Sequence, residues 1–178
     1  MSVRQYLYAL CSLMMLVGCS SPSVQAYAQS EPQLDLFSYF SGETQAYGQF
    51  QDRSGAVKRR FKVAITGTID GDTLTLDERF VYDDGEQEQR IWRIKRLSDN
   101  RYTGSAGDVI GQAEGRSAGS VFNWRYTLDL PYKGRSIQVQ FDDWMFLQSD
   151  GVMLNRAQVT KWGFKVGEVT LFFSKAQP

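Results

Sequence analysis

Apolar and polar residues alternate with a period of two along most of the chain, from about residue 46 onwards. Residues 61–69 are the clearest case, since every second residue there is apolar or glycine. The same alternation recurs at 74–82, 92–94, 122–130, 137–141 and 169–173. Successive side chains of a strand point to opposite faces, so this pattern is typical of half-buried antiparallel strands.

Short turn signals separate these runs: Asp70-Gly71-Asp72, Asp83-Asp84-Gly85, Asp99-Asn100, Lys133-Gly134 and Asp150-Gly151. Loops this short join neighbouring strands as hairpins. We therefore predict an all-β fold of about eight to ten strands in up-and-down order, a sheet long enough to curl and close on itself. The expected architecture is an antiparallel β-barrel or strongly curled sheet of the lipocalin/calycin kind, with a two-sheet sandwich as the alternative.

The N-terminal part of the chain has a different pattern. A single charge, Arg4, precedes an apolar run over residues 6–17, and Gly18-Cys19 follows it. A run of about 12 apolar residues is shorter than the roughly 20 that a membrane-spanning helix needs, and this order of features is typical of a secretory signal peptide. The stretch Leu16-Val17-Gly18-Cys19 is similar to a lipobox, so we predict a signal peptide over 1–18 and lipidation of Cys19. An ordinary signal peptide cleaved near Ala26 or Ala28 is the alternative.

The predicted mature chain then divides into two parts. Residues 19–33 are rich in Ser, Pro, Gln and Ala, and we expect an acylated N-terminus followed by a flexible tether. Leu34, Phe37 and Phe40 fall at helical spacing, which predicts a short helix or turn at the start of a single barrel domain over 34–178. Ser20 follows the acylated residue and favours the outer membrane, so the expected location is its periplasmic face, with acyl chains such as palmitate on Cys19 as the anchor.

Composition narrows the chemistry. The 20 basic residues balance the 20 acidic ones, so no large positive surface for nucleic acid is expected. The chain has no histidine, which argues against Ser-His-Asp and Cys-His catalysis and against most zinc or haem ligation. Its two cysteines are Cys11 and Cys19, so no further thiol is left in the predicted mature chain. We predict no catalytic residues, no metal and no cofactor.

Several polar residues share the apolar face of their strands. Glu78 has the parity of Leu76 and Phe80, and Asp143 has the parity of Phe141. Arg90 and Arg96 share a face with Trp92, and Arg156 shares one with Leu154. Buried carboxylates are costly unless paired, so we expect Glu78 and Asp143 to face Arg156 or Arg96. The alternative is that these groups lie at the barrel rim or form a structural ion pair.

Together these residues predict a cavity for an amphiphile, with an apolar tail and a polar head group. The candidate ligand contacts are Glu78, Trp92, Trp124, Tyr126, Asp143 and Arg156. Trp144 and Phe146 lie on the opposite face of their strand. They are candidates for an aromatic patch that docks a protein partner, unless the N-terminal segment covers them.

Several motifs resemble those of one protein family: Glu78–Gly85, Trp92, Tyr102–Gly104, Asp108–Gly111, Trp124–Tyr126, Phe141–Met145 and Asn155–Ala157. Together they are similar to the domain-of-unknown-function family 3833, a set of uncharacterised lipoproteins of Gram-negative bacteria. The resemblance covers nearly all of the predicted mature chain. It implies a lipoprotein and no particular activity.

Three functions follow from these features, and the first is favoured. It is a membrane-anchored periplasmic lipoprotein whose barrel binds a lipid or another amphiphile. The second is a structural or assembly lipoprotein that docks a partner through Trp144 and Phe146. The third is an acid–base isomerase or cyclase that uses Glu78 or Asp143 on a fatty-acid derivative. A cavity of at least roughly 300 Å³ would favour the first.

Overall fold

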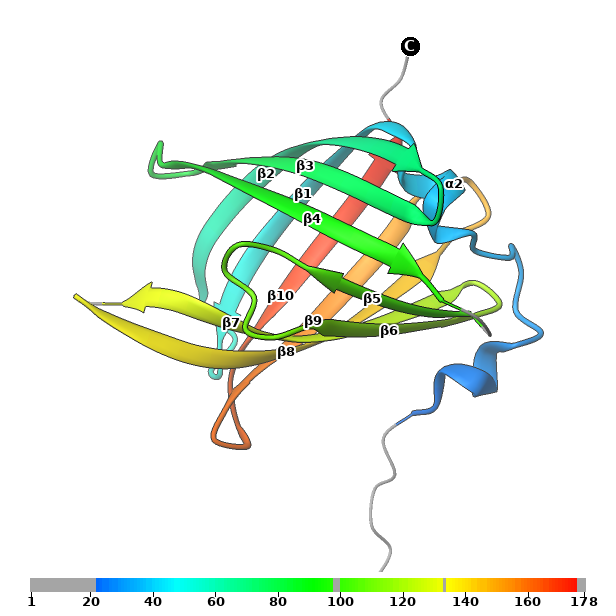
Figure 1. Cartoon of the computed structure of the whole chain (residues 1–178). Helices are drawn as coiled ribbons and strands as arrows, with labels where there is room; N and C mark the ends of the chain where they lie inside the picture. Colours follow the sequence, from blue (N-terminus) through cyan, green and yellow to red (C-terminus); the bar gives the residue numbers. More distant parts are fainter. Residues whose placement is uncertain (1–21, 98–99, 133, 176–178) are drawn as a thin grey trace, which may run out of the picture.

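The computed structural model describes residues 22–97, 100–132 and 134–175. They form a closed barrel of antiparallel strands in which each strand pairs with the next along the chain and β1 pairs with β10 (Figure 1). The strands are β1 Gly42–Asp52, β2 Val57–Asp70, β3 Thr73–Tyr82, β4 Gln87–Arg96, β5 Arg101–Ser105, β6 Ala113–Ala118, β7 Val121–Tyr132, β8 Arg135–Leu147, β9 Met153–Lys161 and β10 Phe164–Lys175. The predicted up-and-down, lipocalin-like barrel is confirmed, and the sandwich does not form.

Alternation along the strands decides which side chains fill the barrel. In β9, Met153, Asn155, Ala157 and Val159 are all buried, whereas the residues between them are exposed. Closure between β1 and β10 pairs Ala46 with Phe173 and leaves neither strand with a free edge. The interior therefore receives one side chain from every second residue of each strand.

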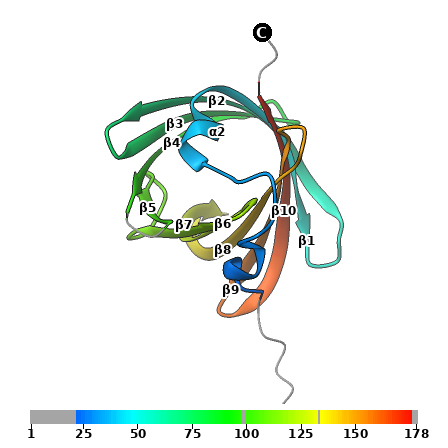
Figure 2. The same cartoon turned by 90° about the vertical axis from the view of Figure 1, so that its right-hand side faces the viewer.

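One end of the barrel is covered by the short helix α2, Leu36–Phe40, and we call it the closed end (Figure 2). Asp35 begins the helix, since its carboxylate accepts a hydrogen bond from the Ser38 amide at 2.7 Å. Phe40 packs edge-on against Phe173 with ring centroids 5.7 Å apart. The close approach of α2 to β2 needs glycine at position 67, because a Cβ there would lie 1.8 Å from the Phe40 carbonyl oxygen. The predicted short helix is thus present, and it closes one end of the barrel.

The segment before α2 also lies against the closed end. The 3-10 helix η2, Val24–Tyr27, contacts β6 and β7. The Ser30 hydroxyl donates to the Tyr27 carbonyl at 2.7 Å and accepts from the Ser120 amide at 2.9 Å. A Cβ at Gly119 would lie 1.9 Å from the Tyr27 carbonyl oxygen, so glycine there permits this contact.

These contacts correct the expectation of a flexible tether. Residues 22–33 are held to the barrel by hydrogen bonds and packing, which their polar composition did not reveal. The predicted signal peptide over 1–18, the lipidated Cys19 and the rest of the predicted tether lie outside the described residues. Within the described ranges, no helix has the length and apolar character that crossing a bilayer requires.

Candidate ligand-binding cavity

A cavity of about 470 Å³ lies inside the barrel, between α2 and the opposite end, which we call the open end. At the open end it is lined by two exposed residues, Glu86 in the β3–β4 turn and Glu88 near the start of β4. Its walls are mostly aromatic and aliphatic, including Phe40, Phe61, Val63, Ile65, Phe80 and Leu171. The volume falls within the range of roughly 300–1,000 Å³ that small-ligand sites occupy.

Aromatic rings form one wall of the cavity. Trp92 of β4 contacts Trp124 and Tyr126 of β7 edge-on, with ring centroids 5.5 and 5.2 Å apart. Tyr126 in turn stacks on Phe141 of β8 at 5.1 Å and an interplanar angle of 7°. Rings packed in these geometries add stability beyond the area they bury, so this wall is well fixed.

A partly buried ion pair lies beside the aromatic wall. Arg90 of β4 donates from Nε and Nη2 to the Asp108 carboxylate, and the shortest distance is 2.7 Å. Asp108 belongs to the loop between β5 and β6, and its carbonyl accepts a hydrogen bond from the Asp129 amide. The bidentate geometry satisfies the Arg90 charge within the protein.

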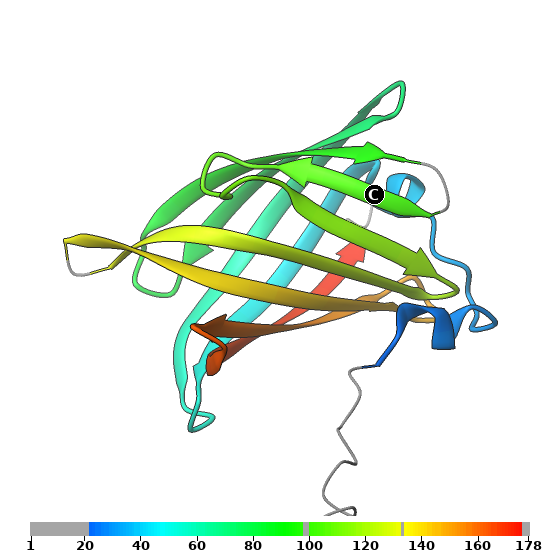
Figure 3. The same cartoon turned by 60° about the horizontal axis from the view of Figure 1, so that its bottom comes forward.

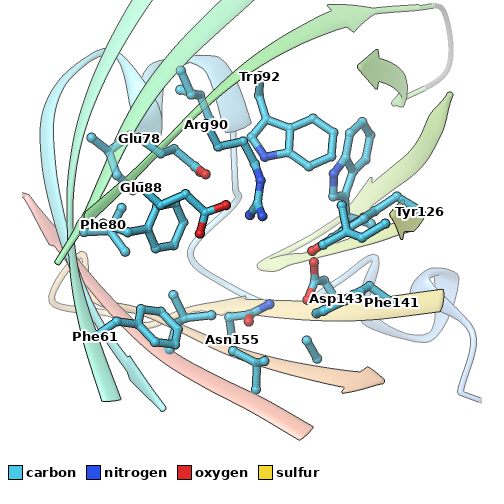
Figure 4. A pocket seen from close by; sticks show the side chains of 18 of the residues that line it. Phe61, Glu78, Phe80, Glu88, Arg90, Trp92, Tyr126, Phe141, Asp143 and Asn155 are labelled. Atoms are coloured by element: carbon cyan, nitrogen blue, oxygen red, sulfur yellow. The ribbon is translucent and has the colours of Figure 1, made fainter. Parts of the chain in front are cut away.

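Two further carboxylates enter the cavity from facing walls. Glu78 comes from β3 and Asp143 from β8, and Figure 4 shows the Arg90 guanidinium between them. Burial raises the pKa of Glu78 to about 7, although Arg90 acts in the opposite direction. Burial also raises the pKa of Asp143 to about 6, against the effect of the neighbouring Tyr126 hydroxyl and Asn155 amide. Neither carboxylate takes part in an ion pair within the described part of the chain.

Asn155 of β9 completes the polar cluster. Its side chain lines the cavity and is 2% exposed. Neither Nδ2 nor Oδ1 has a hydrogen-bond partner in the structure. A buried amide without partners costs free energy, so both of its polar atoms remain able to form hydrogen bonds within the cavity.

Five of the six predicted cavity residues line it: Glu78, Trp92, Trp124, Tyr126 and Asp143. The placement of Arg156 was wrong, because its strand has the opposite parity. Leu154, which was assumed to point inward, is 45% exposed, and Arg156 pairs on the outer surface with Glu168 at 2.8 Å. Asn155, one residue earlier, takes the inward place.

The arginine that meets the buried carboxylates is Arg90. Arg96 instead pairs with Asp35 beside α2, at 2.8 Å, and lies over the Phe37 ring. Sequence reasoning missed Asp108 because it comes from a loop, where no alternation marks the inward side. It missed Asn155 because the alternation pattern assigns polar residues to the outer face of a strand, and Asn155 points inward.

Trp144 and Phe146 lie on the outer face of β8, as their parity predicted, but they are half-buried. The Tyr27 ring of η2 packs against both, with centroids 6.4 and 5.8 Å away. The alternative in which the N-terminal segment covers these residues is therefore the one the structure shows. The polar cavity cluster has no group of three or more acidic, cysteine or histidine side chains arranged to hold a metal, and none occurs elsewhere in the described residues.

Comparison with known proteins places the fold and the family. The barrel is similar to the S-type phycobiliprotein lyase CPES from Guillardia theta, with a TM-score of 0.60 over 80% of this chain and 91% of that one. At 8% identity, this likeness shows a shared fold alone. No curated protein matches the sequence. A family model, described as protein of unknown function (DUF3833), matches residues 13–175, and the chain accordingly belongs to the DUF3833 family.

Proposed function

We propose that the barrel binds a small amphiphilic molecule, with its tail toward α2 and its head group at the polar cluster. The observation that supports this most directly is the cavity itself, about 470 Å³ in volume, in which the buried Asn155 amide has no partner. A barrel packed solely for stability would fill this space and satisfy that amide.

The distribution of side chains along the cavity matches such a ligand. Toward the closed end its lining is apolar, with Leu36, Phe40 and Phe173, whereas Glu78 and Asn155 introduce polar groups farther from α2. A buried methylene group contributes about 0.8 kcal/mol, so a chain of about eight would gain roughly 6 kcal/mol. The polar groups would then fix the orientation of the ligand.

A fluorescent probe tests this proposal. N-phenyl-1-naphthylamine, which is uncharged at neutral pH, is titrated into the purified protein without detergent. The expected result is saturable binding with a blue-shifted emission. Ala157→Phe, which places a ring in the cavity, should weaken binding by about tenfold or more, equivalent to about 1.4 kcal/mol.

Gln158→Phe is the matched control, because this neighbouring residue on β9 is exposed. It should change the affinity by less than about twofold. Circular dichroism checks that both variants fold. If Ala157→Phe does not fold, Val63→Trp serves as a second variant that blocks the cavity. Equal binding by blocked and control variants would overturn the proposal.

We also propose that Cys19 is acylated and anchors the protein to the periplasmic face of the outer membrane. The support is the lipobox-like sequence Leu16-Val17-Gly18-Cys19, followed by Ser20. The test is membrane fractionation on a density gradient, where the natural chain should sediment with outer membranes. Cys19→Ala should release it from the membrane fraction, and recovery of the natural chain with inner membranes would contradict the location.

A further inference from the structure

Charge along the cavity is unequal. Four carboxylates and two guanidinium groups line it: Glu78, Glu86, Glu88 and Asp143 against Arg59 and Arg90. The lining thus has two more acidic groups than basic ones. In a low-dielectric cavity such an excess acts strongly on any charged ligand.

Both guanidinium groups are already engaged by the protein. Arg59 pairs with Asp84 at 3.1 Å and with Glu86, and its guanidinium lies over the Tyr82 ring. Arg90 is held by Asp108, which is not among the lining residues. An anionic ligand therefore finds no unpaired cation on the described walls of the cavity.

The unpaired groups are instead acceptors. Glu78 and Asp143 form no ion pair with the described residues, and the Asn155 amide beside Asp143 has a free carbonyl oxygen. Burial makes these carboxylates unfavourable when charged and unpaired, which is why the pKa of Glu78 rises to about 7. A cation placed among them would remove this penalty.

The aromatic rings of the cavity also favour a cationic ligand. The Arg90 guanidinium lies 5.4 Å from the Phe80 ring centroid, so one cation is already in contact with an aromatic side chain in this cavity. Trp92 lies beside Arg90 on β4, and Tyr126 of β7 contacts the Trp92 ring, as Figure 4 shows. Aromatic faces attract cations by about 0.5–2 kcal/mol, depending on desolvation.

We propose that the cavity takes an amphiphile with a cationic head group, such as a protonated amine, which binds the carboxylates of Glu78 and Asp143 beside the Arg90–Asp108 ion pair, and that it rejects amphiphiles with a carboxylate head group. This inference rests on the proposed binding function and specifies the chemistry of the ligand. The Asn155 amide oxygen accepts a hydrogen bond from the same head group. A carboxylate head group would lie beside two carboxylates that have no ion-pair partner and would find no free cation. Like charges inside a low-dielectric cavity repel each other strongly.

The experiment compares three ligands that share one tail: decylamine, decanol and decanoate. Each displaces N-phenyl-1-naphthylamine from the natural protein, below its critical micelle concentration and at about pH 8, where Glu78 is mostly ionised. Decylamine should compete about tenfold better than decanol and about 100-fold better than decanoate. In Glu78→Gln/Asp143→Asn, decylamine and decanol should agree within about threefold, while binding of the uncharged probe persists.

Glu114→Gln, an exposed carboxylate on the outside of β6, is the matched control and should keep the full preference for decylamine. Decanoate competing as well as decylamine would overturn the inference, as would an unchanged preference in the double variant. If the natural protein does not bind the uncharged probe at all, the binding function itself fails, so the two failures are distinguishable.

Discussion

The two ends of this barrel use the same kinds of residue in opposite ways. At the closed end, Phe37 and Phe40 of α2 are buried, at 5% and 4% exposure. The β9–β10 hairpin lies at the open end, away from α2 (Figure 3). Its aromatic residues Trp162 and Phe164 have 83% and 75% of their surface exposed. Aromatic residues stabilise the fold only where other elements cover them, so stability is concentrated at the closed end.

Acidic residues show the same contrast. Asp35 at the closed end is exposed, and the hydrogen bond from Ser38 and the charge of Arg96 outweigh its slight desolvation and hold its pKa below the usual value. Glu78 in the cavity accepts no hydrogen bond from the described side chains, and burial raises its pKa despite the nearby charge of Arg90. A carboxylate that caps a helix supports folding, whereas one left unpaired in a cavity opposes it. Unpaired groups of the second kind are more common at binding sites than in structural cores.

The largest expected effect comes from Phe40→Ala at the closed end. It removes a ring that packs against Phe173 and Tyr39, and it should lower the free energy of unfolding by about 3–5 kcal/mol. Phe164→Ala, the same substitution at the open end, should change it by less than about 0.5 kcal/mol. Urea denaturation measures both, and similar losses at the two ends would refute the comparison.

A second prediction concerns the buried carboxylates. Because the pKa of Glu78 is higher in the folded than in the unfolded chain, the folded state binds the extra proton between about pH 4.3 and pH 7, and stability falls as the pH rises through this window. The raised pKa of Asp143 acts in the same direction. Glu78→Gln should therefore raise the free energy of unfolding by about 1–3 kcal/mol at about pH 8 and change it little near pH 4.

Denaturation at a series of pH values measures this effect, with Glu114→Gln as the exposed control. Equal gains from Glu78→Gln at both ends of the pH range would show that the ionisation of Glu78 is not the cause.

A smaller effect is expected where the N-terminal segment meets the closed end. Ser30→Ala leaves the Ser120 amide without its acceptor and removes the hydrogen bond to Tyr27, which should cost about 1–2 kcal/mol. Hydrogen exchange should become faster around residues 22–34 and at Ser120, with β1 and β2 unchanged. Ser38→Ala, at an exposed position on α2, should leave exchange at these sites as it is in the natural chain.

The smallest effect is expected at the open end, and it is a gain. Trp162 and Gly163 form the two-residue β9–β10 turn, with φ values of 51° and 80°. Tryptophan is strained at positive φ, whereas Asn-Gly is the favoured pair for such turns. Trp162→Asn should raise the free energy of unfolding by about 0.5 kcal/mol, which thermal denaturation should show as a slightly higher melting temperature. A clear loss would mean that the Trp162 side chain supports the folded barrel.

The sequence predictions were more accurate for strands whose two faces differ clearly in hydrophobicity. In β3 and β4 the apolar residues are large and regularly spaced, and the positions of Glu78 and Trp92 followed from them. In β9 the inward residues are Met153, Asn155, Ala157 and Val159, a mixed set whose parity the outward Leu154 obscures. The placement of Arg156 was wrong for that reason.

The sequence by itself determined that this chain folds as consecutive antiparallel strands joined by hairpins, because alternation and short turns are local properties that need no long-range information. It also determined that carboxylates would share the apolar face. Only the tertiary structure decided which groups meet there, because closure of the barrel brings β3, β4, β8 and β9 around one cavity. Closure pairs Arg90 with Asp108 and leaves Glu78 and Asp143 without an ion pair among the described residues. The neighbours across a cavity depend on strand order, register and loop path together.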